Sequence, residues 1–253
     1  MIHFFKRLRH QLFSGKKSEK AGIQTGRYLK YAIGEIILVV IGILIALSIN
    51  NWNESRKDKI LEMKILNEIH MNLKSTISSL NRTIESEEAN LKYNGLILEY
   101  MEGQKPYSEI LDEAFGMYFW TVTSQPVSAG YDYLKTRGLE LITNDSLRIE
   151  ISLIFENELP VIRSENEKWA NNLQQNVSYP YHVQHFIKYE KESHGEGIEF
   201  SKPINYDALL VDPVFKSINT EIISNRKWNI RSLKELKEKI KNVILKIEEE
   251  YEK

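Results

Sequence analysis

The hydrophobic pattern is dominated by one long apolar stretch near the start of the chain. Residues 36–47 are all apolar or glycine, and the window of low polarity runs from Tyr31 to Ile49, interrupted only by Glu35. A helix of this length is about 28 Å long, close to the roughly 30 Å hydrocarbon core of a bilayer. The pattern therefore predicts a membrane-spanning helix at residues 31–51.

Beyond this window, apolar residues recur every three or four positions, which is typical of an amphipathic helix. No residue that breaks helices occurs between Trp52 and Gly95, whereas Gly103 and Pro106 end the pattern. We expect the membrane helix to continue as one helix to about Met101. Its apolar positions are Leu66, Ile69, Leu73, Ile77, Leu80, Ile84, Leu91 and Leu98, interrupted by Glu87.

Three shorter helical segments are expected next. The first covers residues 107–122, with Ser108 as its N-cap, and its many aromatic residues favour a core over a ligand pocket. After a turn at residues 123–126, the second begins at Ser128 and ends at Gly138. Asn144 or Asp145 caps the third.

This third segment is expected to kink at Pro160 and to end near residues 176–180, since proline removes a backbone donor. Residues 179–205 have the least regular pattern. They contain His182 and His185, which are three positions apart, but a zinc site needs three or four ligands, so no metal or cofactor site is predicted. We expect surface or partly buried histidines there, although an irregular segment of this length is also suited to a binding loop.

Asp212-Pro213 is a typical helix start, with proline in the first turn. The apolar repeat that follows continues to Tyr251 and suits an antiparallel partner for residues 60–101. The predicted fold is therefore all-α, with an N-terminal single transmembrane helix that continues into an elongated antiparallel helical bundle. Its parts are a basic arm (1–30), the membrane helix (31–51) and a helical domain (52–253).

Charge is distributed unevenly about the membrane helix. Residues 1–30 carry a net charge of +7, whereas the remainder carries −8. By the positive-inside rule, the N-terminus is cytoplasmic and the C-terminal domain is exported. A cleaved signal peptide is the alternative, with Ala46-Leu47-Ser48 as its site, but the basic arm is long for one.

Residues 2–13 place apolar side chains on one helical face and basic ones elsewhere. This pattern favours an amphipathic helix on an anionic membrane surface, and a disordered basic tail is the alternative. Nucleic-acid binding is not expected, because the arm is tethered to the membrane. The lipid bilayer is thus the first predicted partner, with Lys30, Tyr31 and Trp52 as anchors at its two interfaces.

Glu35, Gly42 and Ala46 share one face of the membrane helix. Small residues four apart let two helices approach closely, which predicts a helix–helix contact and allows a homo-oligomer. Glu35 lies within the hydrocarbon and is costly there unless it finds a partner, such as Lys30 or Arg27 of a neighbour. The alternatives are a carboxylate that reaches the near interface and a proton-coupled carboxylate in an ion-driven component.

Catalytic chemistry has no signature in this sequence. Cysteine is absent, and no phosphate-binding loop, dinucleotide-binding glycine motif, nucleophile elbow or H-E-x-x-H motif occurs. The many acidic residues fit solvated helix faces. We therefore expect no enzyme and identify no catalytic residue.

The segment GEIILVVIGILIALSINNWNE, residues 34–54, resembles the membrane segment of an uncharacterised family of single-span proteins abundant in Bacteroidota. The N-terminal MIHFFKRLRHQL, the K-Y-A-I-G-E sequence at residues 30–35, and residues 130–152 and 205–217 are also similar to that family. Serine at position 48 departs from the glutamine common there. The resemblance implies an inner-membrane protein with a helical periplasmic domain. It does not point to any activity.

These patterns favour a membrane-anchored periplasmic module that binds an unknown periplasmic or membrane protein, or assembles with itself. The alternatives are a ligand-sensing helical bundle that signals through a partner, and an ion-coupled membrane component that uses Glu35.

Overall fold

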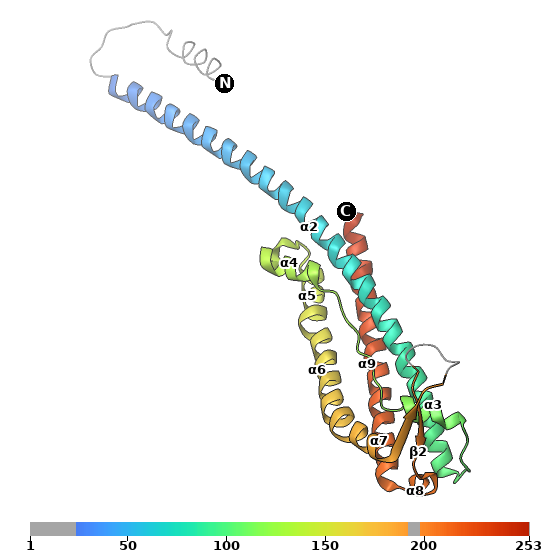
Figure 1. The fold of residues 1–253 in the computed structure, drawn as a ribbon. Coiled ribbons are helices and arrows are strands. Elements are labelled where there is room, and N and C mark those ends of the chain that lie inside the picture. The colour runs from blue at the N-terminus through green and yellow to red at the C-terminus, as the bar shows by residue number, and fades with distance from the viewer. Residues whose placement is uncertain (1–23, 192–197, 253) are drawn as a thin grey trace. The chain divides into compact units, whose positions relative to one another are not determined.

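The structure is a computed structural model that describes residues 24–191 and 198–252, apart from the side chains of residues 24–30, 170 and 171. The expected amphipathic helix at residues 2–13 lies outside this range. The chain divides into two compact units, Met1–Lys57 and Asp58–Lys253. The fold is all-α, as predicted, with one small two-stranded sheet (Figure 1).

Helix α2 extends over Gln24–Glu102 and confirms the prediction of one helix to about Met101. Its first part is the helix in the described chain that is long and apolar enough to cross a membrane. In the second unit, most of its apolar repeat is buried; Leu66, Ile69 and Leu73 are fully enclosed, whereas Ile77, Leu91 and Leu98 are half-buried. Glu102 ends the helix just before Gly103, as the sequence indicates.

Helix α9, Pro213–Tyr251, lies beside the second-unit part of α2 and runs antiparallel to it (Figure 1). Polar contacts between the two helices show this antiparallel direction, because residue numbers fall along α9 as those of their partners rise along α2. The predicted Asp212 cap is confirmed, because its Oδ1 accepts from the Val214 N–H at 2.7 Å. The polar contacts between α2 and α9 that show their antiparallel direction are Asn94–Asn219, Glu87–Arg226, Asn81–Lys237 and His70–Glu248.

Helix α3 is shorter than the predicted helix at 107–122, covering only Ile110–Met117. Glu109 rather than Ser108 occupies its N-cap, and neither the predicted cap nor its extension to residue 122 is correct. Residues 121–128, which we call the strap, have no helical conformation and are held against α2. The prediction overestimated helix here because the tertiary contacts of these residues outweigh their local preference.

Side chains of α2 satisfy the backbone of the strap and of the residues just after it. The N–H groups of Gln125 and Val127 donate to Ser79 Oγ and Thr76 Oγ1, and that of Gly130 donates to Asn72 Oδ1. Successive contacts fall progressively earlier on α2, so the strap runs antiparallel to that helix.

Helix α4, Ala129–Arg137, and its Gly138 end confirm the second predicted segment. Gly138 has φ of 105°, a conformation that favours glycine. A 3₁₀ turn, η1 (Leu139–Leu141), leads to α5, Asp145–Leu153. Asn144 caps α5, as predicted, since its Oδ1 accepts from the Leu147 N–H at 3.2 Å.

The helical arm after α5 is longer than expected and contains two π-helical segments. Pro160 lies in the first turn of α6 (Leu159–Trp169) and directly follows the first π segment, where the wider turn accommodates a residue without an N–H. The predicted end near residues 176–180 is wrong, because helical conformation continues to His185. The other elements are η2 (Ile154–Glu158), η3 (Ala170–Ser178) and α7 (Tyr179–His185).

The described parts of residues 179–205 contain more regular secondary structure than their sequence pattern suggested. Besides α7, they form an antiparallel hairpin of β1, Phe186–Tyr189, and β2, Phe200–Pro203, in which Ile187 pairs with Lys202. Helix α8, Tyr206–Leu210, follows and was also missed; Asn205 caps it. These elements are too short for a periodic pattern to reveal them.

The second unit contains two apolar cores, one after the other along the α2–α9 pair. The first joins residues 65–84 of α2 to residues 230–247 of α9, α4 and α5. The second joins the end of α2 to α3, β1, α8 and residues 215–222 of α9, and is rich in aromatic rings. Residues 107–122 thus contribute side chains to the second core, as expected.

Two glycines offer a test of this packing. A Cβ on Gly116 would lie 2.0 Å from the carbonyl oxygen of Glu199, so α3 packs directly on the backbone at β2. A Cβ on Gly95, which is exposed on α2, would meet nothing within 4 Å.

We predict opposite effects for the two alanine substitutions. Gly116→Ala forces α3 away from β2 and should lower the free energy of unfolding by about 1–3 kcal/mol, as overpacking does. Gly95→Ala should raise it by about 0.5–1 kcal/mol through helix propensity. Urea unfolding of the full chain in detergent, followed by circular dichroism, measures both. Equal effects would contradict the packing of α3 on β2.

Candidate functional site

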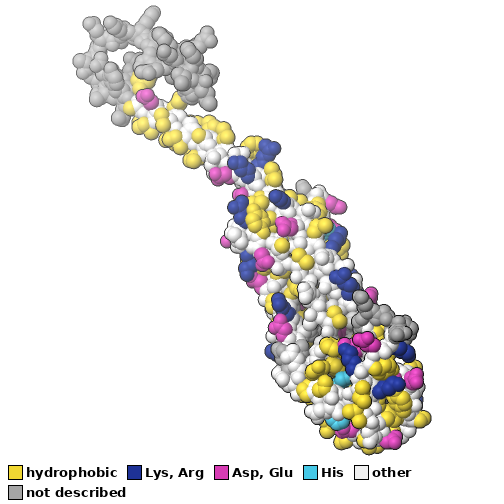
Figure 2. Space-filling model, viewed as in Figure 1, with side chains coloured by type: hydrophobic (Ala, Val, Ile, Leu, Met, Phe, Trp, Pro, Cys, Tyr) yellow, Lys and Arg dark blue, Asp and Glu magenta, His cyan; other side chains and the backbone are white. Residues whose placement is uncertain are grey.

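The residues predicted for a membrane contact lie on a fully exposed part of α2. Every residue from Tyr31 to Ile60 is exposed, and hydrophobic side chains cover this segment (Figure 2). Glu35, Gly42 and Ala46 are therefore all uncovered by the part of the chain that the structure describes. A Cβ on Gly42 would meet nothing within 4 Å. Gly42 thus has no packing role among the described residues.

The predicted interface anchors are only partly described. Tyr31 and Trp52 have 44% and 65% of their surface exposed, which leaves both rings accessible to a lipid interface. The side chain of Lys30 lies outside the described residues, as does that of Arg27. The proposed pairing of Glu35 with either residue is therefore an open prediction.

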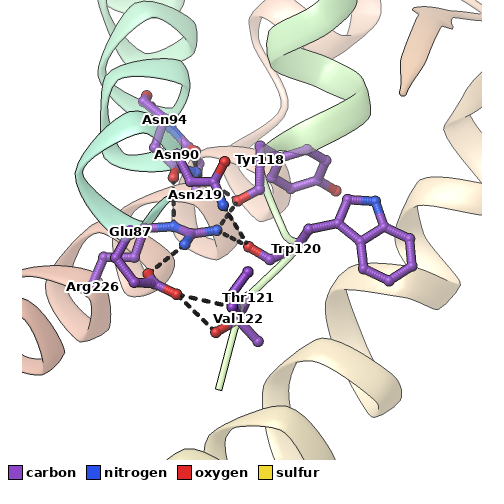
Figure 3. A network of polar contacts seen from close by, with 9 residues as sticks. All are labelled: Glu87, Asn90, Asn94, Tyr118, Trp120, Thr121, Val122, Asn219 and Arg226. Atoms are coloured by element: carbon purple, nitrogen blue, oxygen red, sulfur yellow. Dashed lines mark hydrogen bonds and ion pairs between the residues drawn. The ribbon is translucent and has the colours of Figure 1, made fainter. Parts of the chain in front are cut away.

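In the second unit, a buried polar network lies between the two apolar cores (Figure 3). Arg226 on α9 is at its centre, with only 2% of its surface exposed. Its Nε donates to Asn94 Oδ1 at 2.9 Å, and its Nη2 donates to the carbonyl oxygens of Tyr118 and Trp120. Its Nη1 forms an ion pair with Glu87.

Glu87 completes the network from α2. Its Oε1 accepts from the Thr121 hydroxyl at 2.9 Å and from the Val122 N–H at 3.4 Å, at the start of the strap. Asn94 also exchanges hydrogen bonds with Asn219, and the Asn90 side chain donates to the Trp120 carbonyl. These contacts join α2, α9 and the chain leaving α3 to one another, so the network fixes where α3 ends.

Burial lowers the pKa of the Arg226 guanidinium, and Glu87 opposes that effect. The guanidinium stays charged because the carboxylate and the carbonyl oxygens around it replace its lost solvation. The sequence showed Glu87 only as an interruption of an apolar repeat. A second signal was available, since Arg226 follows Ile222 by four positions and so falls on the apolar side of α9.

His182 lies in the aromatic part of the second core. Its Nε2 is 3.1 Å from the Ser201 hydroxyl, and its ring stacks on Phe186 with centroids 4.6 Å apart. Burial lowers its pKa to about 4, outweighing the opposing effect of Glu199. The ring is therefore neutral at physiological pH and acts as part of the core.

The two histidines of α7, His182 and His185, contact different partners. His185 stacks on Tyr181 and donates through Nδ1 to that residue's carbonyl oxygen at 2.8 Å. Among the described residues, no group of three or more His, Asp or Glu side chains is placed to hold a metal ion. His194 lies outside the described residues.

A cleft of about 460 Å³ opens beside the strap. Its apolar lining includes Leu80 of α2, Phe155 and Leu159. Polar side chains of the strap and of α6 add a hydrogen-bonding rim; they are Thr123, Ser124, Gln125, Arg163, Asn166 and Glu167. Such a mixture of surfaces is typical of small-molecule sites.

The network predicts that the stability of the second unit depends strongly on Arg226. Arg226→Met leaves the buried Glu87 carboxylate without its ion-pair partner and removes one of the two donors to each of the Tyr118 and Trp120 carbonyls. We expect a loss of about 3–5 kcal/mol in the free energy of unfolding, measured by urea titration. Lys227→Met, at the exposed neighbouring position, is the control and should change it by less than about 0.5 kcal/mol. A small effect of Arg226→Met would show that the network contributes little.

The neutral His182 predicts a pH dependence of stability. Because its pKa is about 4 in the folded chain and has the ordinary value of 6.5 in the unfolded chain, the unfolded chain binds more protons between these values. Stability is full above pH 6.5 and falls toward pH 4, by an amount on the order of 3 kcal/mol from this residue.

His182→Gln, which stays neutral, should flatten this part of the pH profile. Unfolding midpoints of the native chain and of both His182→Gln and His185→Gln, measured from pH 7 to pH 4, test this. The His185→Gln profile should follow that of the native chain. If all three profiles coincide, His182 is not the titrating group.

Comparison with known proteins gives one match. Residues 35–159 match the model of a family described as a family of unknown function, DUF6090. No curated protein and no solved structure matches the chain significantly. The match covers α2 from residue 35 onward, α3, the strap, α4, α5 and η2, and it supports the similarity to an uncharacterised family.

Proposed function

We propose that the chain is a single-pass membrane protein whose helical domain acts in protein interaction or assembly rather than in catalysis. The membrane segment anchors it in a bacterial inner membrane, with residues 1–30 cytoplasmic and residues 52–253 periplasmic. The basic arm and the resemblance to a Bacteroidota family support this orientation independently.

The observation that carries the proposal is the exposed glycine of the membrane helix. A glycine inside a helix costs about 1 kcal/mol relative to alanine, and no close contact with another described residue compensates for this cost at Gly42. Gly116 and Gly130, by contrast, are required by close packing inside the second unit. A neighbouring membrane helix that packs on Gly42 and Ala46 accounts for the glycine.

Glu35 fits the same interface. A carboxylate inside the hydrocarbon is stabilised when a basic group of a neighbouring chain reaches it. Use of Glu35 in ion coupling is the less favoured proposal, because the described membrane segment, residues 31–51, offers no second acidic or basic residue for a relay.

A binding role without catalysis is supported by the use of the buried ionisable groups. Arg226 and Glu87 hold the strap, and His182 packs in an aromatic core, so each is engaged in holding the fold. The cleft beside the strap favours one alternative, a ligand-sensing bundle that signals through a partner. A thermal-shift screen of small molecules, with Leu159→Trp to fill the cleft as the control, tests that alternative.

The assembly proposal predicts that bulk at Gly42 separates the membrane helices. Gly42→Leu should weaken self-association about tenfold, since small-residue contacts contribute roughly 1–2 kcal/mol. Fluorescence energy transfer between labelled full-length chains in liposomes, at varied protein-to-lipid ratios, measures this. Val40→Leu, two positions away on the opposite face, is the matched control and should change little.

Ala46→Leu should act in the same direction as Gly42→Leu. If the native chain is monomeric at all ratios and no protein co-purifies with it from solubilised membranes, the proposal is wrong.

A further inference from the structure

The second-unit part of α2 has a continuous face that no other element of the described chain covers. This outward face comprises exposed residues separated by three or four positions, so they form one stripe along the helix. We define it as Ile60, Lys64, Asn67, Met71, Ser75, Ser78, Arg82, Glu85 and Ala89.

The side chains of the outward face suit contact with another helix. Ile60 and Met71 are large and apolar, yet 62% and 60% of their surface is exposed. They are separated by about three helical turns. Ser75, Ser78 and Ala89 are small and allow a neighbouring helix to approach closely. The flexible side chain of Lys64 can keep its ammonium group in solvent at the edge of such a contact.

The charges on this face are self-complementary. Some surface charges of α2 form ion pairs within the chain; Lys74 pairs with Glu248, and Glu88 pairs with Lys234. Arg82 and Glu85 take part in none of the ion pairs found among the described residues. They are three positions apart, about 4.5 Å along the axis. In two parallel helices related by a two-fold axis, each Arg82 reaches the Glu85 of the other chain.

We propose that the outward face of α2 docks on the same face of a second copy of this chain. Two copies anchored in one membrane leave it on the same side, so their α2 helices meet in parallel. A two-fold pair then buries Ile60 and Met71 and forms two symmetric Arg82–Glu85 ion pairs. The inference rests on the proposed self-assembly and names the second contact surface of that assembly.

Disulfide cross-linking of the full chain in membranes tests the contact directly. The native chain has no cysteine, so each variant carries a single thiol. Ser78→Cys, at the centre of the outward face, should give a disulfide-linked dimer severalfold more readily than Asn242→Cys, an exposed position on α9. Equal yields would overturn the proposal.

Charge reversal tests the ion pair. Arg82→Glu brings the carboxylates at positions 82 and 85 of two chains together and should reduce the Ser78→Cys cross-link severalfold. Glu85→Arg should do the same by bringing two guanidinium groups together. The double variant Arg82→Glu/Glu85→Arg restores opposite charges and should recover the native yield. Failure of the double variant to recover would show that the charges do not face each other.

The experiments distinguish the proposed membrane contact at Gly42 from the proposed outward-face contact. If energy transfer shows self-association that Gly42→Leu weakens, but Ser78→Cys cross-links no better than Asn242→Cys, only the outward-face contact is wrong. If the native chain shows no self-association at all, the outward-face contact is wrong; if in addition no protein co-purifies with it, the membrane contact is wrong as well.

Discussion

The fold of the second unit depends on one buried ion pair. Two apolar cores follow each other along α2 and α9, and Arg226 with Glu87 fills the space between them. Apolar residues alone would let the two helices slide or rotate against each other at little cost. A guanidinium that needs a carboxylate, an amide oxygen and two carbonyls permits one register only. The pair therefore supplies specificity, while the cores on either side supply most of the stability.

The same pair determines the path of the chain beyond α3. Its donors occupy the carbonyls of Tyr118 and Trp120, which a longer helix would use internally. The chain then continues as the strap, where Ser79 and Thr76 accept from backbone N–H groups, and Asn72 accepts from the first turn of α4. These polar side chains on α2 therefore act as hydrogen-bond acceptors for the backbone of the strap and of the first turn of α4.

Long elements could be predicted from the sequence, and short ones could not. The length of α2, its long apolar segment, the Asn144 cap and the helix start at Asp212 followed from local patterns, because dozens of residues or a specific side chain carry each signal. The end of α3, the hairpin and α8 depend on contacts with distant residues, and their own patterns are short. The candidate membrane contact at Gly42 and Ala46 is a prediction from spacing, whereas the role of Arg226 depends on partners more than 100 positions away, which spacing does not reveal.

The antiparallel pairing of α2 and α9 also has a consequence for how the domain acquires its structure. His70 contacts Glu248, 178 positions later, so the first core closes only when nearly the whole chain is present. Contacts between such distant positions form at a higher cost in loop-closure entropy than local helical contacts do. As the chain is synthesised, α2 emerges with its apolar face uncovered, before α9 is available to pack against it. A chaperone or the membrane surface that shields this face would protect the nascent chain from aggregation.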